Sequence, residues 1–181
     1  MKTSTTYDHI TAIILASGKG IRFGMPKAEA DFGGATFLEH ITQALQQAGI
    51  TRMHIARTYQ TQDMLATLRQ AVAELKTPNQ ISNAPCTGYL VFPVDFPCVK
   101  PNTLKILLDG HLQNPAAIIR PSYYGFSGHP IIIPESLNLD ADDRGKGLKG
   151  IILHSGSHVI DINVDDEGIH RNIIHPEDLQ A

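Results

Sequence analysis

The sequence predicts a three-layer α/β/α fold in which a mostly parallel, twisted sheet lies between two layers of helices. Three observations favour this Rossmann-like class. Short apolar runs recur along the chain, helix-like periodicity separates several of them, and a glycine-rich loop follows the first run. Strand–helix alternation is typical of open sheets with helices on both faces, where ligands bind beyond the carboxyl ends of the strands.

The expected strands are short apolar runs, and the expected helices repeat their apolar residues every three or four positions. The first strand lies within the run from Ile10 to Leu15, and the others cover residues 53–56, 89–94, 116–120, 130–134 and 158–162. One helix runs from residue 36 to 47 with Gly49 as its stop, and a second covers residues 64–75. A third helix begins at Pro101 or Asn102.

The composition indicates a single domain, residues 1–181, that is large enough to bury a full core. Hydrophobic residues make up 42% and charged residues 18% of the chain, which argues against disorder. A net charge of −3 offers no broad basic surface for nucleic acid. No apolar run approaches the ~20 residues of a membrane span, and the first nine residues lack a signal-peptide core. We therefore expect a cytoplasmic protein that binds neither nucleic acid nor membrane.

The loop from Leu15 to Lys27 predicts a polyphosphate site. Its closely spaced glycines leave backbone N–H groups free to face an anion, and three cations, Lys19, Arg22 and Lys27, lie among them. Two better-known phosphate motifs fail here. Gly24 is followed by methionine instead of the lysine of a nucleotide-hydrolase loop, and Phe23 replaces the third glycine of a dinucleotide fingerprint.

The loop does fit the pattern L-A-A/G-G-x-G-x-R-M/F-G-x-P-K, and so it resembles the molybdenum cofactor cytidylyl- and guanylyltransferases. The resemblance implies the nucleotidyltransferase fold, also known from nucleotide-diphospho-sugar transferases. The nucleotide-binding residues it implies are Leu15, Ala16, Ser17, Gly18, Lys19, Gly20, Arg22, Lys27 and, on the second helix, Thr67. Arg22 and Lys27 would be catalytic, because cations can neutralise charge that develops on the α-phosphate and on departing pyrophosphate.

An acidic centre is expected at Asp95, which ends an apolar strand and resembles the aspartate of the family's D-x-P motif. The resemblance implies that Asp95 is catalytic and binds Mg²⁺, or Mn²⁺ in its place, and a helix-capping or turn-forming role is the alternative. Mg²⁺ needs few protein carboxylates, since water and substrate phosphates complete its shell. Residues 163–179 resemble the family's V-D-D…T-P-E-D-L segment, which implies Asn172 as a second metal ligand.

Two further segments resemble acceptor-binding parts of the family. Gly128 and His129 belong to a G-H-P segment, and Arg144 lies in a charged turn before a helix. His129 could donate to a phosphate or pterin group, or could only fix the loop. Arg144 could contact substrate phosphate, or could belong to a solvated turn.

By resemblance we expect a nucleotidyltransferase that moves a nucleoside monophosphate to molybdopterin or molybdenum cofactor, with CTP favoured over GTP. A molybdoenzyme client is a further partner that the resemblance implies. Two alternatives stay open: a sugar- or polyol-phosphate nucleotidyltransferase, and a non-catalytic nucleotide-binding or cofactor-chaperone protein. The second is motivated by a shortened middle region and by Ile174 and His175, which stand where the family has polar residues.

Overall fold

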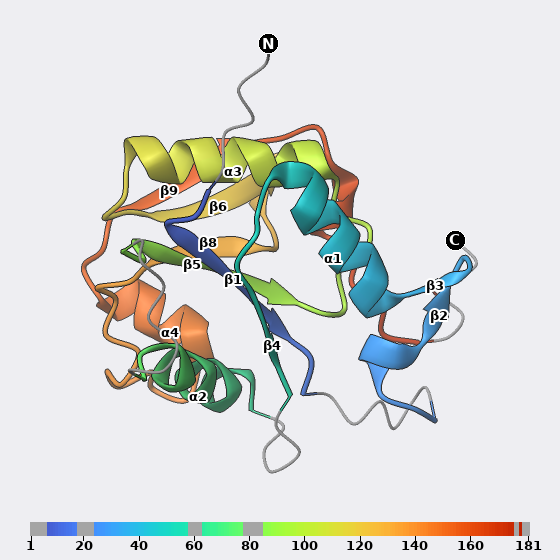
Figure 1. The fold of residues 1–181 in the computed structure, drawn as a ribbon. Helices are drawn as coiled ribbons and strands as arrows, with labels where there is room; N and C mark the ends of the chain where they lie inside the picture. Colours follow the sequence, from blue (N-terminus) through green and yellow to red (C-terminus); the bar gives the residue numbers. More distant parts are fainter. Residues whose placement is uncertain (1–6, 18–23, 58–62, 78–84, 176–177, 179–181) are drawn as a thin grey trace.

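The computed structural model describes residues 7–17, 24–57, 63–77, 85–175 and 178. Within them, a seven-stranded sheet has the order β4-β1-β5-β8-β6-β7, and β9 pairs with β6 (Figure 1). Its strands are β1 (Ile10–Leu15), β4 (Met53–Ala56), β5 (Gly88–Pro93), β6 (Ile118–Tyr123), β7 (Phe126–Ser127), β8 (Ile131–Pro134) and β9 (Val159–Asn163). A separate hairpin joins β2 (Asp31–Phe32) to β3 (Ala35–Thr36). The helices are α1 (Phe37–Ala48), α2 (Met64–Leu75), α3 (Pro101–Gln113) and α4 (Gly147–His154), with 3₁₀ turns η1 (Lys27–Glu29) and η3 (Glu167–Ile169).

Most strands of the sheet run in one direction, which confirms the predicted fold class. Strands β4 and β5 are both parallel to β1, β8 is antiparallel to β5 and to β6, and β9 is parallel to β6. Strands β4, β1, β5, β6 and β9 therefore share one direction, and β8 and β7 oppose it. The strand directions turn progressively from β4 to β6, which gives the sheet its twist (Figure 1).

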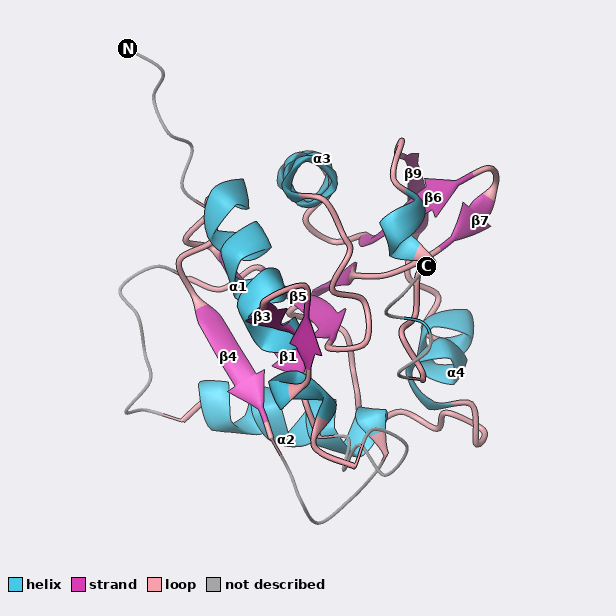
Figure 2. Ribbon diagram, turned by 90° about the vertical axis from the view of Figure 1, so that its right-hand side faces the viewer, coloured by secondary structure: helices cyan, strands magenta, loops and turns pink. Residues whose placement is uncertain are grey.

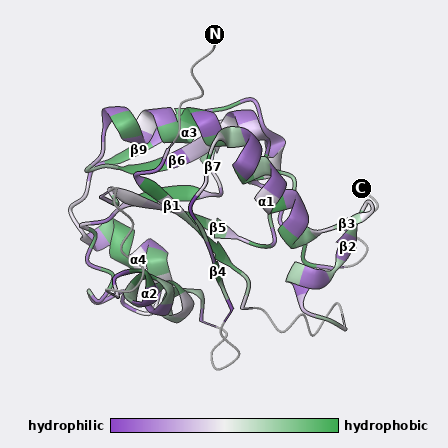
Figure 3. Ribbon diagram, viewed as in Figure 1, coloured by the Kyte–Doolittle hydropathy of each residue, from purple (hydrophilic) through white to green (hydrophobic). Residues whose placement is uncertain are grey.

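Helices cover both faces of the sheet, because successive side chains of each central strand point to opposite sides. Ile10, Ala12 and Ile14 of β1 pack in the core beneath α1 and α3. Ile13 and Leu15 of the same strand pack in a second core beneath α2 and α4. Figure 2 shows the helices around the sheet in a second view, and green, hydrophobic residues are prominent in the central strands in Figure 3. No helix among the described residues combines the length and apolar character needed to cross a membrane.

The predicted helices form where their end signals place them. Thr36 and Glu39 make reciprocal hydrogen bonds in a capping box at the start of α1, and Gly49 ends this helix at a φ of 93°. The Asp63 side chain caps α2 by accepting from the amide of Leu65. Pro101 is the first residue of α3, where its missing N–H costs no intrahelical bond.

The structure adds two hairpins that the sequence analysis did not predict. Gly33 and Gly34, at φ values of 67° and 92°, turn β2 into β3. Tyr124 and Gly125, at 49° and 82°, turn β6 into the antiparallel β7. Two successive positive φ angles are typical of tight hairpin turns and favour glycine. The β6–β7 turn leads back to residues 128–129, so it positions part of the predicted acceptor site.

Candidate active site

The carboxyl ends of β1 and β5 lie side by side and place Asp95 at the edge of the sheet. Leu15 pairs with Pro93 in the register of the two strands. The amide of Val94 then donates to the Leu15 carbonyl at 3.1 Å, which keeps the chain beside β1 for one more residue. Asp95 follows, with its side chain 29% exposed. A ligand that reaches this edge can therefore contact the Asp95 carboxylate.

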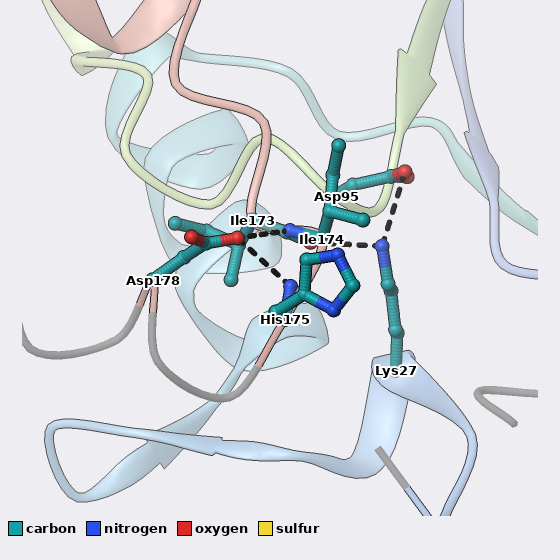
Figure 4. Close-up of polar contacts among 6 residues, drawn as sticks. All are labelled: Lys27, Asp95, Ile173, Ile174, His175 and Asp178. Atoms are coloured by element: carbon teal, nitrogen blue, oxygen red, sulfur yellow. Dashed lines mark hydrogen bonds and ion pairs between the residues drawn. The ribbon is translucent and has the colours of Figure 1, made fainter. Parts of the chain in front are cut away.

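Lys27 reaches the same edge from η1. Ala28 and Ala30 are each 3% exposed and pack in the α1–α3 core, and they anchor the backbone that carries the lysine. The Lys27 Nζ lies 3.4 Å from Asp95 Oδ2 and donates to the Ile173 carbonyl at 2.8 Å (Figure 4). Two residues that are 68 positions apart thus form an ion pair at the end of β5. The fold brings together Lys27, which the sequence predicted as a catalytic cation, and Asp95, which it predicted as a catalytic metal-binding carboxylate.

Residues 173–175 lie beside the Lys27–Asp95 pair. The contacts that Ile173 and Asp178 make there were not predicted from the sequence. Ile173 is 1% exposed and its amide donates to the Asp95 carbonyl at 2.9 Å. The Asp178 Oδ2 accepts from the amides of Ile174 and His175, each at 2.8 Å. These two hydrogen bonds hold the pKa of the Asp178 carboxyl below its usual range, His175 having the larger effect. The signal that could have indicated Asp178 is its place in the Pro176–Leu179 run that resembles the family.

His129 lies beside the Asp95 turn, and Gly128 precedes it in the same loop; acceptor binding by the two residues stays a prediction. The His129 ring packs against Phe96 with 4.8 Å between ring centroids, and its amide donates to the Ile169 carbonyl. Burial lowers the pKa of His129, and the charge of Asp95 acts in the opposite sense. A side chain at Gly128 would place its Cβ 2.5 Å from the Ile169 carbonyl oxygen. A glycine is thus required where this loop approaches η3.

The predicted nucleotide-binding residues are only partly within the described structure. Leu15, Ala16 and Ser17 are 6–7% exposed. Thr67 is 1% exposed and its hydroxyl donates to the Ser17 Oγ at 3.1 Å, so α2 is tied to the chain that leaves β1. This hydroxyl is occupied by protein atoms in the structure. Gly18, Lys19, Gly20 and Arg22 lie outside the described residues.

Asn172 lies on the segment beside the Lys27–Asp95 pair, whereas Arg144 lies in the turn before α4. Asn172 is exposed and directly precedes Ile173, whose amide binds the Asp95 loop, so its backbone lies next to the ion pair. Arg144 is exposed at a φ of 52°, and its amide donates to Asp142 Oδ1 in the turn before α4.

The donor set at this edge fits a divalent cation bound largely by substrate. Asp95 presents one partly exposed carboxylate, and the adjacent segment carries Asn172, an exposed residue with a side-chain amide oxygen. In the part of the chain that the structure describes, no three His, Cys, Asp or Glu side chains cluster as a metal cage. Mg²⁺ and Mn²⁺ accept such sites, because phosphate and water oxygens supply the other ligands.

Comparison with known proteins connects this geometry to a family. The sequence pattern of the MobA-like NTP transferase domain matches residues 12–158. A protein of Bacillus cereus named as a probable molybdenum cofactor guanylyltransferase is 32% identical over 124 residues, which cover 59% of each chain. The chain thus spans about 59% of the length of this curated relative.

Solved structures share the fold. Rv0371c of Mycobacterium tuberculosis superposes with a TM-score of 0.71 at 24% identity, covering 97% of each chain. The same mycobacterial protein is known as a complex with manganese, with a TM-score of 0.59, 24% identity and coverage of 86% of this chain and 88% of that one. The 2-C-methyl-D-erythritol 4-phosphate cytidylyltransferase of Thermus thermophilus has a TM-score of 0.69 at 18% identity, covering 94% of this chain and 95% of its own.

Proposed function

The chain belongs to the MobA-like NTP transferase family, and from this premise we propose that it transfers a nucleotidyl group from an NTP to a phosphorylated acceptor. An acceptor phosphate oxygen bonds to the α-phosphorus of the NTP. The bond from that phosphorus to pyrophosphate breaks, and its electron pair leaves with pyrophosphate. The observation that supports this proposal most directly is the Lys27–Asp95 pair, 3.4 Å apart at the carboxyl ends of neighbouring strands.

In the proposed reaction Lys27 stabilises negative charge. Its ammonium group is held at the edge of the sheet by the Ile173 carbonyl, so it requires little reorganisation when charge develops on the phosphates. Arg22 is proposed as a second cation, and the glycines from 18 to 24 as the backbone cradle of the phosphates. His129 and Gly128 are proposed to line the acceptor side, because His129 packs against Phe96 of the Asp95 turn and Gly128 precedes it in the chain.

Asp95, with Asn172 beside it, is proposed to hold Mg²⁺ or Mn²⁺. When bound, such an ion would neutralise charge on the nucleotide phosphates. The manganese complex of the mycobacterial structural neighbour supports a divalent metal in this fold. We expect Asp95→Asn to weaken both metal-dependent nucleotide binding and pyrophosphate release.

The proposal also specifies the acceptor molecule and the nucleobase of the NTP. A molybdopterin-type acceptor is favoured because the curated relative is named for the molybdenum cofactor. The same name specifies a guanylyltransferase, so the comparisons do not support the preference for CTP that the sequence analysis expected. We therefore propose GTP as the first nucleotide to test, with CTP beside it.

The direct test measures pyrophosphate release from each of the four NTPs with Mg²⁺ or Mn²⁺, with and without a molybdopterin acceptor. Sugar and polyol phosphates serve as competing acceptors. Release that requires one nucleotide and one acceptor supports the proposal and identifies both. Tight nucleotide binding without pyrophosphate under any of these conditions would instead indicate the non-catalytic alternative.

A Lys27→Met variant tests the role of the lysine, since methionine keeps much of the length and removes the charge. We expect kcat to fall about 10²–10³-fold, as for the loss of one preorganised electrostatic contact. Lys105→Met is the matched control, because Lys105 is an exposed residue of α3. Equal rates for Lys27→Met and the wild type would remove Lys27 from the mechanism.

A further inference from the structure

The peptide group between Ile173 and Ile174 connects Lys27 to a carboxylate that the proposed reaction does not otherwise use. Its carbonyl oxygen accepts from Lys27 Nζ at 2.8 Å, and its amide hydrogen is donated to Asp178 Oδ2 at 2.8 Å (Figure 4). The two groups belong to one planar unit, and in a trans peptide they point in opposite directions. Fixing the N–H therefore fixes the direction of the carbonyl.

Asp178 accepts two hydrogen bonds from the turn after Ile173, which is formed by residues 174 and 175. The same carboxylate oxygen also accepts from the amide of His175 at 2.8 Å. Hydrogen bonds to a charged acceptor are shorter and stronger than neutral ones, so two of them define the turn after Ile173. On its other side, Ile173 is anchored by its buried side chain and by its amide, which donates to the Asp95 carbonyl. The carbonyl that holds Lys27 is thus fixed from both directions.

The electrostatics of the arrangement also favour Lys27. A carboxylate on the N–H of a peptide polarises its carbonyl and makes the oxygen a better acceptor, by roughly 10–30% per bond in a hydrogen-bonded chain. The carbonyl contact, at 2.8 Å, is shorter than the 3.4 Å separation of Lys27 from Asp95. The position of the ammonium group is therefore set at least as much by the turn as by the ion pair.

The turn uses backbone atoms of Ile174 and His175, and both side chains are exposed. Any residue with an N–H could form these two hydrogen bonds. This explains how an isoleucine and a histidine can stand at positions where the resembling family carries polar residues. Only position 178 needs a particular side chain, because its carboxylate accepts both hydrogen bonds.

We propose that Asp178 is a positioning residue for Lys27: it orients the Ile173–Ile174 peptide, whose carbonyl holds the ammonium group beside Asp95. This inference rests on the proposed nucleotidyl transfer, in which Lys27 acts on the developing charge. Because Asp178 acts through Lys27, its removal affects the transition state more than the binding of the nucleotide.

The test compares kcat and KM for Asp178→Ala and Asp178→Asn. We expect Asp178→Ala to lower kcat about 10–100-fold, the range for groups that orient a functional ligand, with KM for the NTP within about twofold of wild type. Asparagine keeps an acceptor oxygen, so Asp178→Asn should recover part of the loss. Asp165→Ala is the matched control, since it removes an exposed carboxylate nearby in the sequence and should leave kcat unchanged.

A double-mutant cycle with Lys27→Met tests whether the effect of Asp178 on kcat passes through Lys27. If Asp178 acts through Lys27, Asp178→Ala should lower kcat no more than about twofold further once Lys27 is replaced. An unchanged kcat in Asp178→Ala, no recovery in Asp178→Asn, or the same fold loss in both backgrounds would overturn the proposal. A wild type that releases no pyrophosphate overturns the proposed function itself, and the role of Asp178 with it.

Amide hydrogen exchange provides a readout that is independent of activity. The Ile174 and His175 amides should exchange about tenfold or more faster in Asp178→Ala than in the wild type, while amides of β1 and β5 stay protected. Unchanged exchange at Ile174 and His175 would show that Asp178 does not hold the turn. Loss of protection throughout β1 and β5 would instead show that the variant acts by unfolding, which also overturns the positioning role.

Discussion

His111 makes the stability of the fold sensitive to acid. The side chain lies on α3 and is 0% exposed. Its Nε2 lies 3.1 Å from the Thr87 hydroxyl, its Nδ1 has no hydrogen-bond partner among the described residues, and its ring stacks on His9 at 6.4 Å. Burial, and then the charge of His9, lower the pKa of His111 from 6.5 to about 4. The folded protein therefore resists protonation of a group that the unfolded chain protonates readily.

The size of the effect follows from the two pKa values. Above pH 6.5 neither state carries the proton, and the free energy of unfolding is unaffected. Between pH 6.5 and about 4 only the unfolded state binds it, so stability falls by up to about 1.4 kcal/mol per pH unit. Over the whole interval the loss is about 3 kcal/mol, a large fraction of the ~5–15 kcal/mol typical of a domain.

Urea unfolding of the wild type and of His111→Gln at pH 7, 5.5 and 4.5 measures this loss. Glutamine cannot be protonated in this range, so the wild type should lose about 2–3 kcal/mol more than the variant between pH 7 and 4.5. His158→Gln, which replaces an exposed histidine, should instead follow the wild type. Parallel pH dependence of the wild type and His111→Gln would refute the reasoning.

Two further substitutions test how the fold positions the site. Thr36→Ala removes the capping box of α1 and should cost about 1 kcal/mol of unfolding free energy in urea, whereas an unchanged midpoint would show that the cap contributes nothing. Gly128→Ala places a methyl group 2.5 Å from the Ile169 carbonyl oxygen and should cost about 1–3 kcal/mol by overpacking; a variant as stable as the wild type would show that the loop relaxes freely there.

Periodicity and turn signals were sufficient to predict most of the fold. The predicted helix at residues 64–75 agrees with α2, and the predicted strand at 53–56 agrees with β4. The reversed direction of β8 could not be inferred, because its apolar run looks the same in either orientation. The β2–β3 hairpin was missed although Gly33–Gly34 is a hairpin signal, because strands of two residues show no alternation.

The sequence indicates candidate site residues where a side chain has a chemistry of its own. Lys27 and Asp95 were identified from a glycine-rich loop and a strand end, and the fold places them 3.4 Å apart. The Ile173 carbonyl could not be found in this way, since every residue carries one and only the tertiary structure shows which carbonyl meets a lysine. Arg22 stays a prediction, because it lies outside the described residues.

The hydrogen bond from Lys27 to Ile173 spans 146 positions of the chain, and this separation has a consequence for biosynthesis. At about 5–20 residues per second, a ribosome needs roughly 7 to 30 seconds after making the lysine before it adds the residue that holds it. Strands β1, β4 and β5 are complete long before then. A nascent chain can therefore bury much of its interior before the residue that holds Lys27 has been made, so that the proposed activity has to wait for this late contact.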